Sequence, residues 1–575
     1  MQIRHLSIQY FRGIAHLQWT PSNSTVCLIG PNDSRKSTIL SAIEFALSPR
    51  WNLQFFDTDF YKADTSRPIT IIVTVGQLPE RLLALNRFGG HLRGWRPGLG
   101  LIDEPNDGDE EVLSIRLQVD ESLEPKWDVI NDRNPDGETI SARDREKLGV
   151  NQLGSYVERD LTWSRGSALA RFTVDLDNLP AILARMNRTA RQTLSEVTLT
   201  ELEDAVKKVE SLAGEFGVRA ESGLKVAIDA QVSGLNAGGL ALHDGDVPSR
   251  QMGLGTRRLL TAAIQKSTTV TGAILLVDEI EHGLEPHRLR QMIRLIRATN
   301  GDKHVPHLAQ TIMTTHSTTA ICELKANELC VVRTSAGETT VQSITHRLQG
   351  LVRAVPEAFL ARKVIVCEGK TEVGLLRALD IKWAQSNEGM GLAYYGVALI
   401  EGGGRNNAPE KAIDLATLGY KVLLFADSDA KINPSREEVE SVGAKVVQWS
   451  DNCHTEARIC LDIPWGTIQL LLDLIMEVDT EQDISEQTTT DILAGYIGCN
   501  STLIKSNSLN EWAKNNITQD QIRSGIGAAC NKKKWFKNTS LGEKVGELVI
   551  EVFANIPETD LHKKLTEIHQ WTTTN

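Results

Sequence analysis

Short apolar runs that stop abruptly at charged residues recur along the chain and predict buried strands. Ile274 to Val277 and Val364 to Cys367 have strand length and no polar position, as expected of parallel strands covered on both faces. Residues 2–30 predict two further strands, the first alternating over IRHLSIQYFRGI and the second an apolar run in STVCLIG. Residues 38–47 and 370–379 instead carry apolar positions at helical spacing. Together these patterns predict an α/β fold.

Carboxylates stand directly after two of these apolar runs. Glu368 and Glu372 follow the run that ends at Cys367, and Asp427 and Asp429 end the run in KVLLFADSDA. Ligands of open α/β sheets gather beyond the carboxyl ends of the strands, and carboxylates at buried strand ends need a cation or a donor. The set therefore indicates a hard divalent ion, Mg²⁺ or Mn²⁺. The alternative is that Asp427 and Asp429 cap a helix and Glu368 joins a salt bridge.

The segment GPNDSRKST, which follows the second predicted strand, nearly matches a phosphate-binding loop. Backbone N–H groups of such a loop and of the next helix cradle phosphates. Lys36 would contact the β- and γ-phosphates, and Ser37 would hold Mg²⁺. Gly30, Asn32 and Thr38 complete the candidate residues, so we expect this loop to bind ATP with Mg²⁺.

Arg35 departs from that loop pattern, which has glycine at this position. Glycine lets the backbone approach a phosphate and adopt unusual dihedral angles. A long side chain would either strain the loop or add a phosphate contact. The departure therefore leaves the rate of ATP hydrolysis open, while binding is still expected.

A second half of the nucleotide site follows much later in the chain. AILLVDEIEHGLEP resembles a Walker B motif, in which Asp278 supports Mg²⁺ and Glu279 polarises the attacking water. His316, at the end of TIMTTHS, resembles a histidine that senses the γ-phosphate; the alternative is a histidine satisfied at a strand end. QMGLGTRRLL weakly resembles an ABC signature loop. In the ABC class two ATPase heads sandwich ATP, so Gly253 and Gly255 would act in trans and a homodimer is implied.

Composition limits the class of protein. A chain of 575 residues accommodates two to four domains. Eight scattered cysteines without a C-x-x-C pair favour a reducing cytosol, and we expect neither a transmembrane helix nor a signal peptide. The net charge of −12 does not favour nucleic-acid binding. Basic clusters within residues 81–96, 185–191 and 532–534 are each more typical of a solvated face than of a DNA track.

The motifs together resemble a known family. EGKTE with the D-x-D of FADSDA looks like a Toprim domain, the fold shared by topoisomerases, primases and some nucleases. An ABC-type ATPase followed directly by Toprim resembles the OLD (overcoming lysogenization defect) family. That family includes the nuclease subunit of the Gabija anti-phage system and nucleases encoded beside some retrons. The expected domains are the ATPase in two parts (1–154 and 226–350), a helical insertion for dimer contacts (155–225), and a C-terminal Rossmann-like Toprim domain (351–575).

This resemblance implies a metal-dependent DNA endonuclease gated by ATP. Two Mg²⁺ ions would activate a water and stabilise the leaving oxygen, held by Glu368, Glu372, Asp427 and Asp429. Glu456 is either a further metal ligand or a surface helix residue. Family members use a late lysine to steady the transition state, for which Lys537 is the first candidate and Lys534 the second.

The implied partners are DNA and further copies of the chain, as a dimer or tetramer. A helicase, or a retron reverse transcriptase with its DNA product, would be a further partner. Two other functions compete with the nuclease. A regulatory ATPase of the RecF or SMC type, whose Toprim domain only binds DNA, would tolerate loss of Glu368. A strand-passage or priming enzyme has little support, because no context for a partner tyrosine is recognisable. We prefer the nuclease since its four carboxylates are intact.

Overall fold

The computed structural model contains two compact units, Met1–Pro356 and Glu357–Asn575. It describes residues 1–83, 88–153, 159–164, 167, 169, 200–218, 220–228, 240–268, 273–297, 308–481, 484–504 and 517–574. Most of the predicted helical insertion, including Arg185, Arg188 and Arg191, lies outside these residues. Within the described part of that stretch, α6 (Thr200–Glu215) is a helix. The predicted division of the first unit at residues 154 and 225 stays a prediction.

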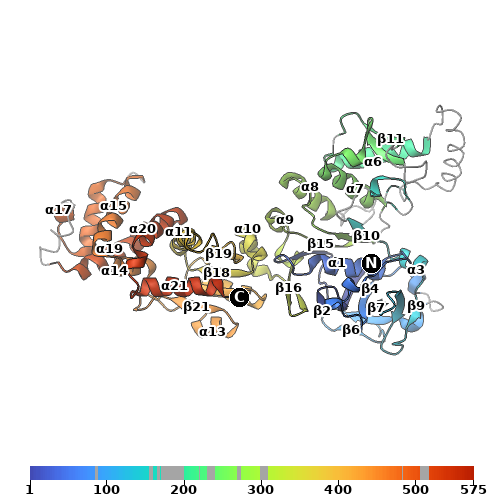
Figure 1. Ribbon diagram of the computed structural model, residues 1–575, viewed down its shortest axis with the longest axis horizontal. Helices are drawn as coiled ribbons and strands as arrows, with labels where there is room; N and C mark the ends of the chain where they lie inside the picture. Colours follow the sequence, from blue (N-terminus) through green and yellow to red (C-terminus); the bar gives the residue numbers. More distant parts are fainter. Residues whose placement is uncertain are drawn as a thin grey trace. The chain divides into compact units, whose positions relative to one another are not determined.

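The first unit is built on a sheet with a parallel half and a mainly antiparallel half (Figure 1). The parallel half, in spatial order, consists of β10 (Val150–Leu153), β14 (Ala273–Val277), β15 (Leu308–Thr314), β3 (Thr25–Ile29) and β16 (Leu329–Ser335). The other half continues through β17 (Glu338–Ser343), β2 (Ile14–Trp19), β1 (Gln2–Phe11), β4 (Ile69–Gly76), β7 (Glu110–Val119), β5 (Arg93–Arg96) and β6 (Gly100–Ile102), while β8 (Pro125–Ile130) pairs with β7. The parallel strands direct their carboxyl ends to the nucleotide loop.

The prediction of two strands between residues 2 and 30 is wrong in number, because β2 forms between the alternating segment and the apolar run. β1 and β2 are an antiparallel hairpin in which Phe11 pairs with Ile14. The turn between them consists of Arg12, with a φ of 50°, and Gly13. The pair Arg12-Gly13 is not the Asn-Gly or Asp-Gly typical of such turns, and apolar residues continue beyond it at Ile14 and Leu17, so the sequence gives only a weak signal of the reversal.

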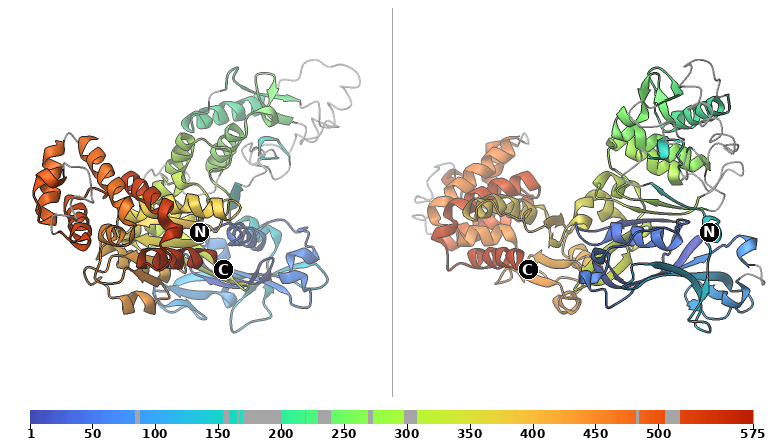
Figure 2. Two further views of the ribbon diagram at one scale, coloured as in Figure 1. Left: turned by 60° about the vertical axis from the view of Figure 1, so that its left-hand side comes forward. Right: turned by 45° about the vertical axis from the view of Figure 1, so that its right-hand side comes forward.

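The described helices of the first unit cover the parallel half of the sheet and extend beyond it. They include α1 (Lys36–Leu47), α7 (Leu254–Thr268), α8 (Pro286–Arg297) and α9 (Thr318–Glu323). Figure 2 shows α6, α7 and α8 as one group, coloured green, beside β11 (Leu224–Ile228). No helix among the described residues of either unit has both the length and the apolar composition needed to cross a membrane.

The second unit contains a four-stranded parallel sheet and a group of helices. The strand order is β19 (Val397–Glu401), β18 (Lys363–Cys367), β20 (Lys421–Ala426) and β21 (Lys445–Gln448). Every residue of β18 is buried, as its apolar pattern predicts. Its described helices include α11 (Lys370–Ser386), α12 (Asn407–Thr417), α14 (Thr455–Asp462), α15 (Trp465–Glu481), α16 (Glu486–Ile497), α19 (Gln519–Lys533), α20 (Thr539–Val552) and α21 (Asp560–Thr573).

Glycines allow α11 and α20 to pack closely. A β-carbon at Gly374 would lie 2.3 Å from the Thr539 carbonyl oxygen, and one at Gly542 would lie 2.8 Å from the carbonyl oxygen of Thr371. Backbone contact at these distances excludes any side chain. The packing fixes the start of α11, which carries the first carboxylates of the sheet edge.

Candidate functional site

The central strands of the second unit bring Glu368 and Asp427 together. The backbone N–H of Glu368 donates to the Phe425 carbonyl oxygen at 2.8 Å. The backbone N–H of Asp427 in turn donates to Oε2 of Glu368 at 3.0 Å. Parallel pairing of β18 with β20 therefore places the two carboxylates side by side at one edge of the sheet. Asp429 follows on the same loop and is exposed.

Glu372 lies in the first turn of α11 and is 1% exposed. Its Oε2 accepts a hydrogen bond from the Gly369 backbone N–H at 2.8 Å, which caps the helix. Its Oε1 is buried and has no hydrogen-bond partner in the described part of the chain. A buried carboxylate oxygen without a donor is costly, so this atom marks a position where a cation would be stabilising.

The start of α14 contacts Asp427. Oδ1 of Asp427 accepts hydrogen bonds from the backbone N–H of Thr455 at 2.8 Å and from its hydroxyl at 2.9 Å. The alternative role of a helix cap is thus present in part, because Asp427 satisfies the first residue of α14. Oδ2 receives no hydrogen bond from any described residue, so it is available to a ligand.

Glu456 is 2% exposed, so the alternative of a surface helix residue is wrong. Its Oε1 lies 2.9 Å from Lys537 Nζ and 3.1 Å from the Thr371 hydroxyl. Its Oε2 lies 3.1 Å from Nδ1 of His454. All of these contacts come from protein groups, which indicates that Glu456 orients Lys537 at the carboxylate cluster. Its predicted role as a metal ligand stays a prediction.

The carboxylates of this cluster disfavour one another's charge. Burial raises the pKa of Asp427 well above its usual range, and the neighbouring carboxylates of Glu372 and Glu368 add to the shift. Burial likewise raises the pKa of Glu368 and of Glu372. Burial also acts against the charged form of Glu456, but hydrogen bonding from His454 and the charge of Lys537 lower its pKa to about 2. In their ionised forms these four carboxylates would outnumber the one lysine beside them, Lys537.

These side chains fit a divalent cation by their chemistry. Oε1 of Glu372 has no hydrogen-bond partner among the described residues, and burial raises the pKa of Glu368, Glu372 and Asp427. A cation bound here would favour the charged forms of these groups. As they stand, no three His, Cys, Asp or Glu side chains in the described ranges are already arranged to hold a metal ion. Binding would therefore require the carboxylates to rotate toward the ion.

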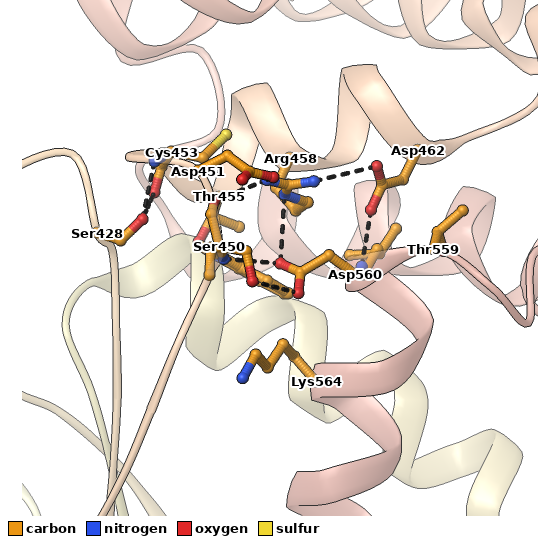
Figure 3. Close-up of polar contacts among 12 residues, drawn as sticks. Ser428, Ser450, Asp451, Cys453, Thr455, Arg458, Asp462, Thr559, Asp560 and Lys564 are labelled. Atoms are coloured by element: carbon orange, nitrogen blue, oxygen red, sulfur yellow. Dashed lines mark hydrogen bonds and ion pairs between the residues drawn. The ribbon is translucent and has the colours of Figure 1, made fainter.

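A buried arginine holds the loop that delivers Thr455 and Glu456 (Figure 3). Arg458 donates to the Ser450 carbonyl oxygen at 2.7 Å and to Asp462 at 3.3 Å, and its Nε lies 3.5 Å from Asp560. Asp560, the first residue of α21, also accepts hydrogen bonds from the backbone N–H and hydroxyl of Ser450, both at 2.8 Å. The last helix of the chain is thus fastened to the loop before α14.

In the first unit, the nucleotide loop connects β3 to α1. Nζ of Lys36 donates to the carbonyl oxygens of Gly30 and Pro31 at 3.1 and 2.9 Å and to the Ser34 hydroxyl at 3.2 Å. Burial lowers the pKa of Lys36 to about 8, against the effect of nearby Asp278. Asn32 and Ser37 are exposed and Thr38 is partly exposed. A buried ammonium held only by neutral oxygens would gain from a phosphate.

Arg35 occupies the N-cap of α1 in the left-handed conformation, with a φ of 74° and a ψ of 19°. A β-carbon at Gly13 would lie 2.1 Å from Arg35 Nε, so the arginine side chain packs on the Gly13 backbone. Left-handed geometry costs a residue other than glycine about 1–2 kcal/mol. Of the two alternatives for Arg35, the backbone strain is present in the structure. The contact between its side chain and a phosphate stays a prediction.

The predicted Walker B residues meet the nucleotide loop. Oδ1 of Asp278 accepts from the Ser37 hydroxyl at 2.9 Å and from the Thr314 hydroxyl at 2.7 Å. Glu279 has a left-handed φ of 45°. Its backbone N–H donates to Thr314 at 2.8 Å, and its carbonyl oxygen accepts from fully buried Arg258 at 3.0 Å. Ser37, Asp278 and Glu279 thus share one site.

His316 joins this site through Glu281, a residue that sequence analysis missed. Oε1 of Glu281 accepts from the His316 backbone N–H at 2.7 Å, and Oε2 accepts from the Thr315 hydroxyl at 2.6 Å. Burial lowers the pKa of His316, as does the nearby charge of Lys36. The imidazole is therefore neutral near pH 7 and is exposed toward solvent.

The glycines of the QMGLG segment have different surroundings. A β-carbon at Gly255 would lie 2.3 Å from the Gly283 carbonyl oxygen, so Gly255 packs within its own chain. Gly253 is exposed and has open space around it. Of the two, Gly253 is the residue available to a second copy, and action in trans stays a prediction.

Sequence analysis also missed Thr371, Thr455, Thr314 and Arg258. Thr371 and Thr455 each precede a glutamate that was singled out, and Thr314 lies two residues before His316. Their hydroxyls donate to more distant carboxylates, which are Glu456, Asp427 and Asp278 respectively. Proximity to the motif is the only sequence signal for them. Arg258 lies within an apparently amphipathic helix, and nothing in the sequence distinguishes it from exposed Arg residues.

Fold and sites together define an ATPase domain followed by a Toprim domain. The chain belongs to the family described as "AAA domain, putative AbiEii toxin, Type IV TA system", whose model matches residues 26–323. Residues 359–429 match "Overcoming lysogenization defect protein-like, TOPRIM domain". The order of the two domains is the ATPase–Toprim architecture of the OLD family, as the motifs predict.

Comparison with individual proteins adds little to these family matches. No curated protein matches the chain. Among solved structures, the SMC head domain from Thermotoga maritima is 10% identical, covering 60% of this chain and 100% of that one, with a TM-score of 0.29.

Proposed function

We propose that the protein is a metal-dependent DNA endonuclease regulated by ATP. One observation carries the proposal: Glu368, Glu372 and Asp427 are gathered with Lys537 and Glu456 at the carboxyl edge of the Toprim sheet, four carboxylates beside one lysine. Structural carboxylates are normally neutralised by partners, whereas perturbed ones in a cluster indicate a functional site.

Glu368, Glu372, Asp427 and Asp429 would hold Mg²⁺ or Mn²⁺. A pair of such ions supplies an activated water and stabilises the leaving oxygen of a phosphodiester. Lys537, kept charged by Glu456, would bind the phosphate and offset the charge that develops on it. Thr371 and His454 hold Glu456 in position, and Thr455 holds Asp427.

ATP would bind at Lys36, Ser37 and Asp278 and change the activity of the nuclease through binding or hydrolysis. Glu279 would polarise the attacking water, and His316 would contact the γ-phosphate. Joining of two copies across the nucleotide would make the active form a dimer or tetramer. The OLD-like architecture supports a role in bacterial anti-phage defence, with a helicase or a retron reverse transcriptase as a further partner.

A regulatory ATPase with a Toprim domain that only binds DNA is the second candidate. It is favoured by the caps that Asp427 and Glu372 provide to α14 and α11, because a purely structural role also uses such contacts.

Cleavage of supercoiled plasmid separates the two candidates. Wild type and Asp427→Ala are compared in Mg²⁺ and Mn²⁺, with and without ATP. The nuclease predicts metal-dependent nicking or linearisation that Asp427→Ala loses. Intact plasmid with wild type in every metal, also after addition of neighbouring gene products, would favour the regulatory ATPase.

A further inference from the structure

Exposed cations follow the strands whose ends carry the Toprim carboxylates, and they form no ion pair with those carboxylates in the part of the chain that the structure describes. Lys370 follows β18, Arg405 follows β19 and Lys431 follows β20, and all three side chains are exposed. None of them forms an ion pair within the described residues. Elsewhere in the same unit, cations commonly pair with carboxylates, as Arg377, Arg436, Lys445 and Lys544 do.

Backbone contacts fix these three cations around the site. The Gly404 N–H, next to Arg405, donates to the carbonyl oxygen of Glu368 at 2.8 Å. The Asn433 N–H donates to the Arg405 carbonyl oxygen at 3.3 Å, which joins the loop after β19 to the loop that contains Lys431. Lys370 precedes Thr371, whose hydroxyl lies 2.9 Å from the Phe536 carbonyl oxygen. These contacts hold the segments that carry the three cations at the same edge of the sheet as Glu368 and Asp427.

A run of lysines just before Lys537 adds further exposed cations to this unit. Lys532, Lys533 and Lys534 end α19, are exposed, and form no ion pair within the described residues. The Lys537 N–H donates to the Lys534 carbonyl oxygen at 3.1 Å, which ties the run to the carboxylate cluster. By contrast, Arg93 and Arg96 of the first basic cluster pair with Asp132 and Asp109.

The charge of the chain indicates what these exposed cations could bind. A chain with a net charge of −12 and a carboxylate cluster repels a polyanion, so binding at the cluster needs local positive charge. Lysine and arginine side chains form strong charge-assisted hydrogen bonds to phosphates, and those without a carboxylate partner need break no ion pair to do so. We propose that Lys370, Arg405, Lys431 and Lys532–Lys534 form a collar that binds the sugar–phosphate backbone of duplex DNA on both sides of the phosphate presented to Glu368 and Asp427. This inference rests on the proposed nuclease function and names the residues that hold its substrate.

The test measures duplex binding by the full chain carrying Asp427→Ala, which leaves the DNA intact. Anisotropy of a short fluorescein-labelled duplex is recorded over a salt series. The first collar variant adds Lys370→Ala, Arg405→Ala and Lys431→Ala, and the second adds Lys532→Ala, Lys533→Ala and Lys534→Ala. The matched control adds Arg362→Ala, Lys382→Ala and Lys421→Ala, which also removes three exposed cations of this unit that lack ion pairs in the described residues.

Each lost phosphate contact reduces the magnitude of the slope of log K against log salt by about 0.9. Each collar variant removes three cations, so the magnitude of its slope is expected to be smaller than that of the parent by about 2.7. The control keeps the slope of the parent. Unchanged slopes in both collar variants would contradict the proposed role of the collar in DNA binding. Plasmid cleavage by wild type would in that case still support the proposed nuclease function. Reduced slopes without any cleavage by wild type uphold the collar and overturn the nuclease. A parent that does not bind the duplex at low salt overturns both.

Discussion

At the scale of single residues, substitution of Lys537 is expected to affect both cleavage and stability, and the two effects can be measured separately. Lys537→Met leaves buried Glu456 without its cation, although Thr371 and His454 remain. We expect cleavage to be lost and the free energy of unfolding to fall by about 1–3 kcal/mol, since Lys537 is only half-buried. Plasmid cleavage and urea unfolding measure the two effects.

Two further variants control this prediction. Lys544→Met breaks an exposed pair with Glu477 on the same unit and is expected to cost less than about 1 kcal/mol without affecting cleavage. Adding Glu456→Gln to Lys537→Met should recover much of the stability while cleavage stays lost. Normal cleavage by Lys537→Met would exclude the lysine from catalysis.

Arg35 offers a second prediction at this scale. Its left-handed φ of 74° favours glycine. Arg35→Gly is therefore expected to raise the free energy of unfolding by about 1 kcal/mol, measured in urea without nucleotide. If the side chain also binds phosphate, the same variant weakens ATP binding in calorimetry despite its greater stability. A less stable Arg35→Gly would show that packing on Gly13 outweighs the backbone strain.

At the scale of elements, α21 acts on the site through Asp560. Asp560→Asn weakens acceptance from Ser450 and removes the charge beside Arg458. We expect a loss of about 1–3 kcal/mol in stability and reduced cleavage, because the loop that carries Thr455 and Glu456 loosens. Asp451→Asn is the matched control, since Asp451 contacts the same arginine from an exposed position. Equal effects of the two substitutions would contradict a specific role for α21.

The contact between α11 and α20 gives the second prediction for elements. Gly542→Ala places a β-carbon 2.8 Å from the Thr371 carbonyl oxygen, and overpacking of this kind costs about 1–3 kcal/mol. Gly495→Ala in α16, where a β-carbon meets nothing within 4 Å, is expected to stabilise by up to about 1 kcal/mol. Thermal unfolding of both variants tests the pair, and stabilisation by Gly542→Ala would contradict the close packing.

An element could be predicted from the sequence only where the residues that determine it are close together in the chain. Strands β14, β18 and β20 were predictable because a buried run and its terminal charged residue are adjacent in sequence. The burial of Glu456 was not, since a carboxylate in the first turn of a helix looks the same whether it faces solvent or Lys537. The α11–α20 contact joins segments distant in sequence, so its glycines carry no local pattern. The β1–β2 turn was not predictable because Arg12-Gly13 is not the Asn-Gly or Asp-Gly pair that usually marks a two-residue hairpin turn.

At the scale of the whole molecule, the two units have separate hydrophobic cores. One core is assembled around β1, β4, β7 and α1, and the other around β18, β20, α11 and the C-terminal helices. Each unit also carries its own candidate ligand site, a nucleotide loop in the first and a carboxylate cluster in the second. Any regulation of cleavage by ATP therefore has to pass between two structures that are stabilised independently.

Independent cores predict two unfolding transitions with different ligand responses. ATP with Mg²⁺ should raise the melting temperature of one transition, and Mn²⁺ alone should raise the other by offsetting repulsion among Glu368, Glu372 and Asp427. A ligand at about 100 times its Kd contributes about 2.7 kcal/mol, which corresponds to several degrees for a unit of this size. Calorimetry assigns the transitions, because Lys36→Ala should abolish only the first shift and Asp427→Ala only the second. A single transition that responds to both ligands would instead mean that the units unfold together, and the route from ATP to the nuclease would then be a shared folded interface.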